Sequence, residues 1–102
     1  MRLLVFFDLP VVKDEERRDY QKFRRFLIND GYNMVQFSVY SRICNGIDAT
    51  NKHISRLMHN LPSKGSVRYL QITEKQYTQM KFLVGKPKSQ EIKIKATQLS
   101  IF

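Results

Sequence analysis

The chain is poor in the residues that build disulfides, zinc sites and membrane spans. Cys44 is its one cysteine, which excludes an internal disulfide. His53 and His59 would lie about 120° apart on a helix, and no second cysteine is available to complete a zinc set. No apolar run is long enough to cross a membrane, and the first residues have a strand pattern rather than that of a secretion signal. We therefore expect a cytoplasmic protein without structural zinc.

Acidic residues are also scarce. The 9 Asp and Glu stand against 18 Lys and Arg, which gives a formal net charge of +9 and predicts a polyanionic partner. Nucleic acid is favoured over an anionic membrane surface, because the amphipathic stretches carry the aromatic stripes of core-facing helices. A chain of 102 residues forms one domain with a small core, so we expect an elaborate active site to need a second subunit.

The first predicted element is a strand over residues 2 to 8. Its residues are apolar at both odd and even positions, which is typical of a central strand covered on both faces. A helix is predicted over residues 14 to 30, because acidic residues at 14 to 16 favour the positive end of the helix dipole and Gly31 can end the helix. Its predicted core face consists of Tyr20, Phe23, Phe26 and Leu27.

Residues 32 to 44 are rich in aromatic and β-branched side chains and are predicted to be extended. Because this stretch is long for one strand, we expect two strands that meet at a bend or bulge near residues 36 to 38. A second helix is predicted after the turn at Asn45 and Gly46, with Asp48 as its N-cap. Its predicted buried stripe consists of Ile47, Ile54, Leu57, Met58 and Leu61.

A further strand is predicted over residues 66 to 73, and a short helix over residues 74 to 84 that Gly85 closes. The order of elements is the β-α-β-β-α-β arrangement of a ferredoxin-like α+β sandwich, which we assign to residues 1 to 85 with an extra C-terminal helix and strand. Both main helices of such a fold cover one side of the sheet. The apolar second side of the first strand therefore predicts a homodimer.

Residues 86 to 102 are predicted to be a linker followed by a C-terminal strand and tail. A strand so far from the core needs an edge to pair with, so we expect it to add to a sheet of the partner subunit or of another protein. The alternative is a frayed tail. The residues that this prediction assigns to partner binding are Ile92, Ile94, Leu99, Ile101 and Phe102.

Asp8 ends the most apolar run of the chain. A carboxylate at the edge of the core is expected to have a partner, a metal or water, because burying it unpaired costs several kcal/mol. If two chains meet on the face that carries Asp8, symmetry supplies a second carboxylate and one Mg²⁺ can bridge the pair. The alternative is a strand-end cap or turn residue, since Pro10 follows closely.

The outer face of the first predicted helix is basic. Arg18, Lys22 and Arg25 rise along one line, and Arg17 and Arg24 lie along one flank. Such a stripe can follow a phosphate backbone and bind nucleic acid tightly only at modest ionic strength. The alternative is an ordinary solvated helix face whose charges are partly paired with neighbouring carboxylates.

Three separate stretches together carry a resemblance to a known family. They are Phe6-Phe7-Asp8-Leu9-Pro10, then Gly31-Tyr32 with Val35-Gln36-Phe37-Ser38-Val39-Tyr40, and finally Ser66-Val67-Arg68 leading to Ile72-Thr73. With this spacing, residues 2 to 85 resemble CRISPR-associated protein two, the small subunit of the spacer-acquisition machinery. The resemblance implies a ferredoxin-like homodimer that sits between two dimers of the CRISPR-associated integrase and helps to hold double-stranded DNA for insertion.

The same resemblance implies a magnesium-dependent endonuclease activity on RNA or DNA, with Asp8 as the catalytic and metal-binding residue. It also implies that the C-terminal strand over residues 91 to 95 pairs across the dimer or docks the integrase. Two hypotheses follow. In the favoured one the chain is a nucleic-acid-binding scaffold of CRISPR adaptation with endonuclease activity; in the alternative it is primarily a metal-dependent endoribonuclease or endodeoxyribonuclease that acts independently of the integrase.

Overall fold

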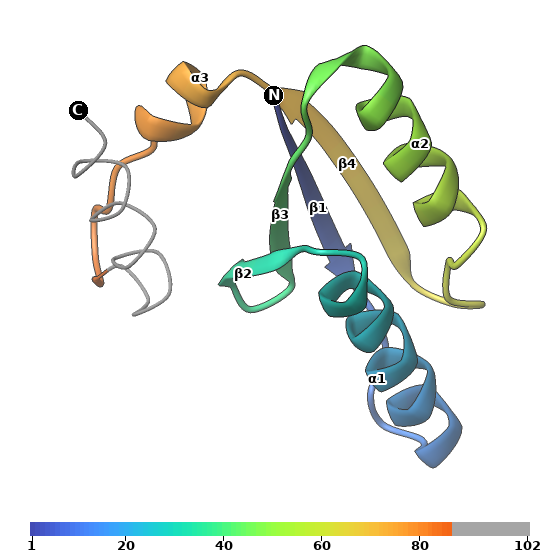
Figure 1. Ribbon diagram of the computed structural model, residues 1–102. Helices are drawn as coiled ribbons and strands as arrows, with labels where there is room; N and C mark the ends of the chain where they lie inside the picture. The colour runs from blue at the N-terminus through green and yellow to red at the C-terminus, as the bar shows by residue number, and fades with distance from the viewer. Residues whose placement is uncertain (87–102) are drawn as a thin grey trace.

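The computed structural model describes residues 1 to 86, which form a four-stranded antiparallel sheet and three helices (Figure 1). The elements are β1 (Arg2–Asp8), α1 (Asp14–Asn29), β2 (Asn33–Gln36), β3 (Val39–Ile43), α2 (Gly46–Met58), β4 (Ser66–Ile72) and α3 (Glu74–Thr78). The strands lie in the order β2-β3-β1-β4, so the predicted α+β class is confirmed. The predicted C-terminal strand and tail, with their assigned partner-binding residues, lie outside the described residues.

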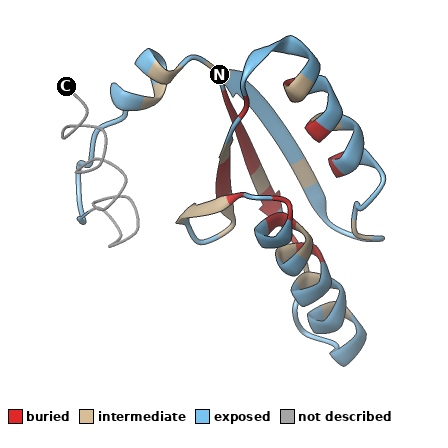
Figure 2. Ribbon diagram, viewed as in Figure 1, coloured by how far each residue is buried: buried red, intermediate tan, exposed pale blue. Residues whose placement is uncertain are grey.

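β1 is the central strand, as predicted, because it pairs with β3 on one side and β4 on the other. Leu3, Val5 and Phe7 are buried in one core cluster with apolar side chains of both α1 and α2. These two helices therefore cover the same face of the sheet (Figure 1). Burial is concentrated on β1 and β3, whereas most of β4 is exposed (Figure 2).

α1 has the predicted core face and the predicted end. Phe23 and Leu27 are buried, and the other two aromatic residues of that face pack against the core while remaining partly exposed. At the C-terminus the N–H of Tyr32 donates to the Leu27 carbonyl at 2.9 Å, and the N–H of Gly31 donates to Ile28 at 3.1 Å. Gly31 has φ +92°, a left-handed conformation that glycine adopts at little cost in such a helix-ending motif.

The predicted break within residues 32 to 44 is confirmed. β2 and β3 form an antiparallel pair with a bulge between Met34 and Gln36, and they are joined by a tight turn at Phe37 and Ser38. Ser38 has φ +65°, which is uncommon for a residue with a side chain. Its carbonyl accepts a hydrogen bond of 3.0 Å from the N–H of Phe7, so the turn is fixed beside the end of β1.

α2 begins earlier than predicted. Asn45 is its N-cap residue and Asp48 lies in its first turn, so the prediction of Asp48 as the cap is wrong. The predicted buried stripe is also partly wrong, because Ile47 and Met58 are 74% and 64% exposed. They lie to one side of the line that faces the core, and Leu61 lies beyond the end of the helix and is exposed.

The residues that α2 does bury are Thr50, His53 and Leu57. Two of these are polar, and each has a partner that lowers the cost of burial. The Thr50 hydroxyl donates to the Gly46 carbonyl at 2.8 Å, and His53 contacts a buried carboxylate of the α1 terminus. Of the predicted stripe, Leu57 is buried and Ile54 packs against the core, and two hydrogen-bonded polar residues complete the buried line.

α3 is shorter than predicted and ends at Thr78. Its start is well capped, since the Thr73 hydroxyl accepts from the Gln76 N–H at 3.1 Å and the Gln76 side chain accepts from the Thr73 N–H at 2.9 Å. None of its residues is buried, so little apolar packing supports a longer helix. The residues that follow are exposed, Leu83 and Val84 by 96% and 93%.

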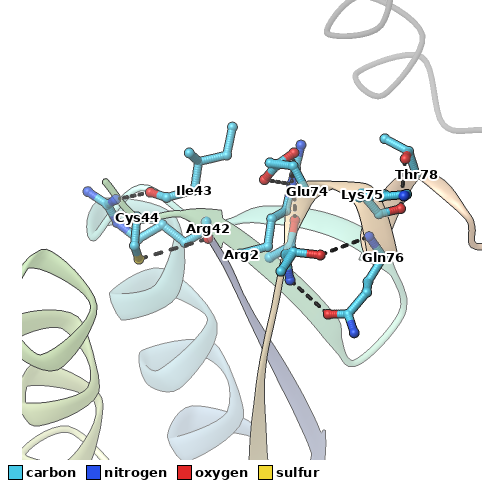
Figure 3. A network of polar contacts seen from close by, with 10 residues as sticks. Arg2, Arg42, Ile43, Cys44, Glu74, Lys75, Gln76 and Thr78 are labelled. Carbon is cyan, nitrogen blue, oxygen red and sulfur yellow. Dashed lines mark hydrogen bonds and ion pairs between the residues drawn. The ribbon is translucent and has the colours of Figure 1, made fainter. Parts of the chain in front are cut away.

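One buried side chain attaches α3 to the sheet (Figure 3). Arg2 at the start of β1 forms an ion pair of 2.9 Å with Glu74 and lies 3.9 Å from the ring centre of Tyr77. It also donates to the Ser41 hydroxyl at 3.2 Å.

Among residues 1 to 86, no helix is long and apolar enough to span a bilayer.

Candidate functional site

Asp8 lies at the end of β1 and points to the face of the sheet that α1 and α2 do not cover. Successive strand residues alternate between faces, and Leu3, Val5 and Phe7 belong to the core below the helices. Asp8 pairs with Ser66 of β4 and is exposed, so water can solvate its carboxylate in a single chain. Of the partner, metal or water that we expected beside this carboxylate, a single chain offers water.

The face that carries Asp8 is apolar over much of its area. Leu4 pairs with Leu70, and Arg2 pairs with Ile72, so the side chains of β1 and β4 alternate onto this face together. Leu4 is buried between its neighbours, but Leu70 is 52% exposed. We call the surface formed by Leu4, Phe6, Asp8, Val39, Ile43, Arg68, Leu70 and Ile72 the open face. Asp8 is at one end of it.

The backbone of Asp8 is held close to a glycine in the loop before β4. Gly65 has φ +89°, and a Cβ added there would lie 2.5 Å from the Asp8 carbonyl oxygen and 3.0 Å from the Leu9 Cα. Only a residue without a side chain allows this approach of the two chain segments. Gly65 therefore helps to determine where Asp8 lies relative to the start of β4.

We expect the Gly65→Ala variant to lose about 2 kcal/mol of unfolding free energy, because it combines left-handed strain with a clash against backbone. Gly46→Ala is the matched control: Gly46 has φ +90°, but a Cβ there would meet nothing within 4 Å. The control should lose about 1 kcal/mol or less. Urea unfolding of both variants measures the difference, and equal losses would show that the close approach to Asp8 contributes nothing.

The other carboxylates that the sequence offered do not approach Asp8. Glu74 is paired with Arg2 at the far end of β1, and Asp48 lies in the first turn of α2. Over the described residues, no group of three or more His, Cys, Asp or Glu is placed to hold a metal ion. Within residues 1 to 86, Asp8 therefore does not belong to a metal-holding cluster of that size.

Asp30, the last residue of the first predicted helix, has a buried carboxylate. Its Oδ2 lies 3.0 Å from His53 Nδ1 and its Oδ1 lies 2.7 Å from an Arg56 guanidinium nitrogen. Arg42 donates to the Asp30 carbonyl at 2.6 Å. The Asp30 side chain is only 3% exposed, so this cluster attaches the end of α1 to the middle of α2. A signal was available, since His53 lies on the same helical line as Thr50 and Leu57.

Tyr32 lies beside this cluster, and its buried hydroxyl has no hydrogen-bond partner among the described residues. Burial, reinforced by the Asp30 carboxylate, raises the pKa of the Tyr32 hydroxyl well above its ordinary value. A buried hydroxyl without a partner opposes folding.

We therefore expect Tyr32→Phe to be neutral or to raise the unfolding free energy by about 1 kcal/mol at neutral pH. The pKa of the Tyr32 hydroxyl is higher in the folded than in the unfolded wild-type protein. Ionisation of Tyr32 therefore leaves the free energy of unfolding unchanged below the unfolded pKa of about 10 and lowers it as pH rises above that value. The variant should lack that alkaline loss. Urea unfolding at neutral and alkaline pH tests both points, and a loss above about 1 kcal/mol at neutral pH would reveal a partner for the hydroxyl.

The five basic residues predicted on α1 fall into two groups. Arg24 points inward and donates to the Tyr40 hydroxyl at 2.9 Å. Arg17 pairs with Asp14 and donates to the carbonyls of the preceding loop. By contrast Arg18, Lys22 and Arg25 are exposed and make no hydrogen bond or ion pair with the part of the chain that the structure describes. We call these three residues the basic stripe.

The fold and the strand-end carboxylate place the chain in a class of small α+β proteins, and comparison with known proteins identifies the family. The model of CRISPR associated protein Cas2 matches residues 1 to 80. A CRISPR-associated endoribonuclease Cas2 of Acidovorax ebreus is 63% identical over 102 residues, which is 100% of both chains. Another, of Ligilactobacillus salivarius, is 51% identical over 86 residues, covering 84% of this chain and 85% of the relative.

The crystal structure of Streptococcus pyogenes Cas2 at pH 6.5 is similar in fold, with a TM-score of 0.62 and 21% sequence identity. The match covers 82% of this chain and 100% of that one. The chain belongs to the CRISPR associated protein Cas2 family. The resemblance inferred from the three sequence stretches is thereby confirmed.

Proposed function

We propose that the chain acts as a ferredoxin-like homodimer in which two open faces meet. The observation that carries this proposal is the position of an exposed carboxylate at the end of an exposed apolar surface. The strand order β2-β3-β1-β4, with α1 and α2 on one face, supports the ferredoxin-like assignment. Association would remove Leu70 and its apolar neighbours from water and bring a second Asp8 into the same site.

The pair of Asp8 carboxylates would hold Mg²⁺, and the activity we propose is endonuclease cleavage of RNA or DNA. Mg²⁺ is usually held by one or two carboxylates while keeping several waters, so two copies of Asp8 fit its requirements whereas a larger cluster is unnecessary. When bound, the ion would stabilise negative charge on the phosphodiester. Asp8 fits this role sterically, since it is exposed and fixed by the ladder to β4. The relatives named above carry the name endoribonuclease.

The basic stripe would bind the phosphate backbone of double-stranded DNA or of RNA. It consists of exposed cations that no ion pair with a described residue neutralises, and the chain carries a net charge of +9. In a homodimer two stripes are available for one nucleic acid. This arrangement would suit a subunit of CRISPR adaptation that holds DNA for insertion between two dimers of the CRISPR-associated integrase.

The attachment of α3 supports a docking role for the C-terminal part of the chain. Arg2 and Glu74 fix the direction in which the chain leaves β4, and Figure 1 shows α3 away from α1 and α2. Phe82, Leu83 and Val84 are apolar and exposed, so they are available to a partner subunit or to the integrase.

The basic stripe can be tested by its effect on salt dependence. We expect the triple variant Arg18→Glu, Lys22→Glu and Arg25→Glu to lose more than about 10-fold in duplex affinity at about 0.1 M salt. The slope of log affinity against log salt should become shallower by about 0.9 for each phosphate that the variant no longer neutralises. Fluorescence anisotropy with a labelled duplex over a range of salt concentrations measures both quantities.

A control variant with the same change in net charge separates the stripe from general electrostatics. Lys52, Lys64 and Lys75 are exposed and lie on α2, the following loop and α3. Replacing all three by Glu should weaken binding less and leave the salt slope nearly unchanged. Equal effects of the two triple variants would remove α1 from the path of the nucleic acid.

A further inference from the structure

Two glycines of the chain follow an Asn or an Asp, and the fold places these two pairs in opposite surroundings. The pairs are Asp30–Gly31 at the end of α1 and Asn45–Gly46 between β3 and α2. In such a pair the backbone nitrogen of the glycine can attack the side-chain carbonyl carbon of the preceding residue, because glycine has no Cβ to shield it. The reaction requires that the side chain and the N–H are both free to approach each other.

Asp30–Gly31 is protected from this reaction. The Asp30 carboxylate is only 3% exposed and is held by His53 at 3.0 Å and by Arg56 at 2.7 Å. The Gly31 N–H donates to the Ile28 carbonyl at 3.1 Å. Attack would have to break the contacts of both groups, so this pair should be inert while the chain is folded.

Asn45–Gly46 lacks these protections within residues 1 to 86. Asn45 is exposed, and although it is the N-cap residue of α2, its side chain makes no capping hydrogen bond. Gly46 is the first residue of the helix, where a backbone N–H has no partner within the helix. A Cβ added to Gly46 would meet nothing within 4 Å, so water can reach this peptide.

We propose that Asn45 is a site of spontaneous deamidation in the folded protein. The Gly46 nitrogen forms a bond to Cγ of Asn45, and the side-chain amide group leaves as ammonia, taking up the proton of the Gly46 N–H. A succinimide ring remains, and water opens it at either of its carbonyl carbons. One product is aspartate at position 45. The other is isoaspartate, in which the backbone continues through the former side-chain carbonyl carbon.

The two products should differ in stability, because the chain is anchored on both sides of Asn45. The N–H of Cys44 donates to the Met1 carbonyl at 2.8 Å, and the Thr50 hydroxyl donates to the Gly46 carbonyl at 2.8 Å. Aspartate leaves the backbone unchanged and is as good an N-cap residue as asparagine. Isoaspartate inserts an extra carbon into the backbone between these anchors, so the start of α2 has to shift.

Peptide mapping of the intact chain, aged in a mildly alkaline buffer with and without urea, tests the proposal. The peptide that contains Asn45 should convert in the folded protein to two products that carry OH in place of NH2, one of them isoaspartate. Urea should accelerate isoaspartate formation at position 30 at least about 10-fold and at position 45 by less than about 3-fold. No conversion of Asn45 in the folded chain, or equal acceleration at the two positions, would overturn the proposal.

Two variants identify the reacting groups. Gly46→Ala should slow the conversion of Asn45 at least about 10-fold, because the added side chain hinders the attacking nitrogen. Asn45→Ser keeps a good N-cap residue but has no amide to lose, so position 45 should then be stable. Conversion of Asn45 at the wild-type rate in Gly46→Ala would show that the Gly46 nitrogen is not the nucleophile and would overturn the mechanism.

Urea unfolding tests the difference between the two products. The aged chain should show an additional transition at lower urea than the fresh chain, whereas Asn45→Asp should keep the midpoint of the fresh wild type. Treatment with an isoaspartyl methyltransferase, which returns isoaspartate to aspartate, should remove the additional transition. An aged chain that contains isoaspartate at position 45 but unfolds like the fresh one would overturn the inferred shift of α2.

Discussion

Asp8→Asn is expected to lower magnesium-dependent cleavage of a labelled RNA or DNA substrate at least about 100-fold. The amide keeps the size of the side chain but removes the negative charge that would hold the ion, and the metal contributes several kcal/mol to stabilising the transition state. Asp8 is exposed, so the substitution should leave the fold and its thermal midpoint unchanged. Initial cleavage rates at saturating Mg²⁺ provide the measurement.

Two controls make the Asp8 result specific. Glu15→Gln removes another exposed carboxylate, from the first turn of α1, and should leave the cleavage rate unchanged. The mass of Asp8→Asn in sedimentation and its duplex affinity in EDTA should equal those of the wild type. Cleavage that survives Asp8→Asn would show that this residue does not carry the activity. A failure of spacer integration with dimer and DNA affinity intact would instead exclude a purely structural Asp8.

Asp30→Ala is expected to be the most destabilising substitution, with a loss of about 3 kcal/mol of unfolding free energy. It removes the carboxylate that contacts both His53 and Arg56 and leaves the buried His53 ring without this partner. Domains of this size are stable by about 5 to 15 kcal/mol, so the loss is a large fraction of the total. Urea unfolding measures it directly.

The control for Asp30 is Asp48→Ala, which removes an exposed carboxylate from the first turn of α2. Only a favourable interaction with the helix dipole is removed there, about 0.5 kcal/mol. If the two variants lost similar amounts of unfolding free energy, the attachment of α1 to α2 would not depend on Asp30.

A second consequence concerns binding. Because α1 carries the basic stripe, loosening its end should weaken duplex affinity in Asp30→Ala.

The sequence predicted the sheet better than the second helix. β1 was recognisable because its short apolar run is typical of a central strand, and the break at Phe37 and Ser38 followed from a stretch too long for one strand. The buried line of α2 was predicted only in part: Leu57 is buried as expected, but Thr50 and His53 were missed, because their burial depends on a local hydrogen bond and on a distant partner. Hydrophobic periodicity does not register such polar residues.

The candidate site was predicted only in part for a related reason. The position of Asp8 at a strand end followed from the pattern, but its exposure depends on which face the helices cover. Likewise the sequence placed Arg24 on the flank of the helix and Arg25 on its outer line, but it could not show the hydrogen bond of Arg24 to the Tyr40 hydroxyl, which requires the packing of α1 against β3. Interactions between distant elements decided both cases.

The central claim is that two Asp8 carboxylates from two copies act together, and mixing wild-type chains with Asp8→Asn chains tests it most directly. After subunits have exchanged at constant total protein, mixed dimers carry one carboxylate and should be inactive. Cleavage should then fall with the square of the wild-type fraction. A fall in direct proportion to that fraction would contradict the account, because each Asp8 would then act on its own.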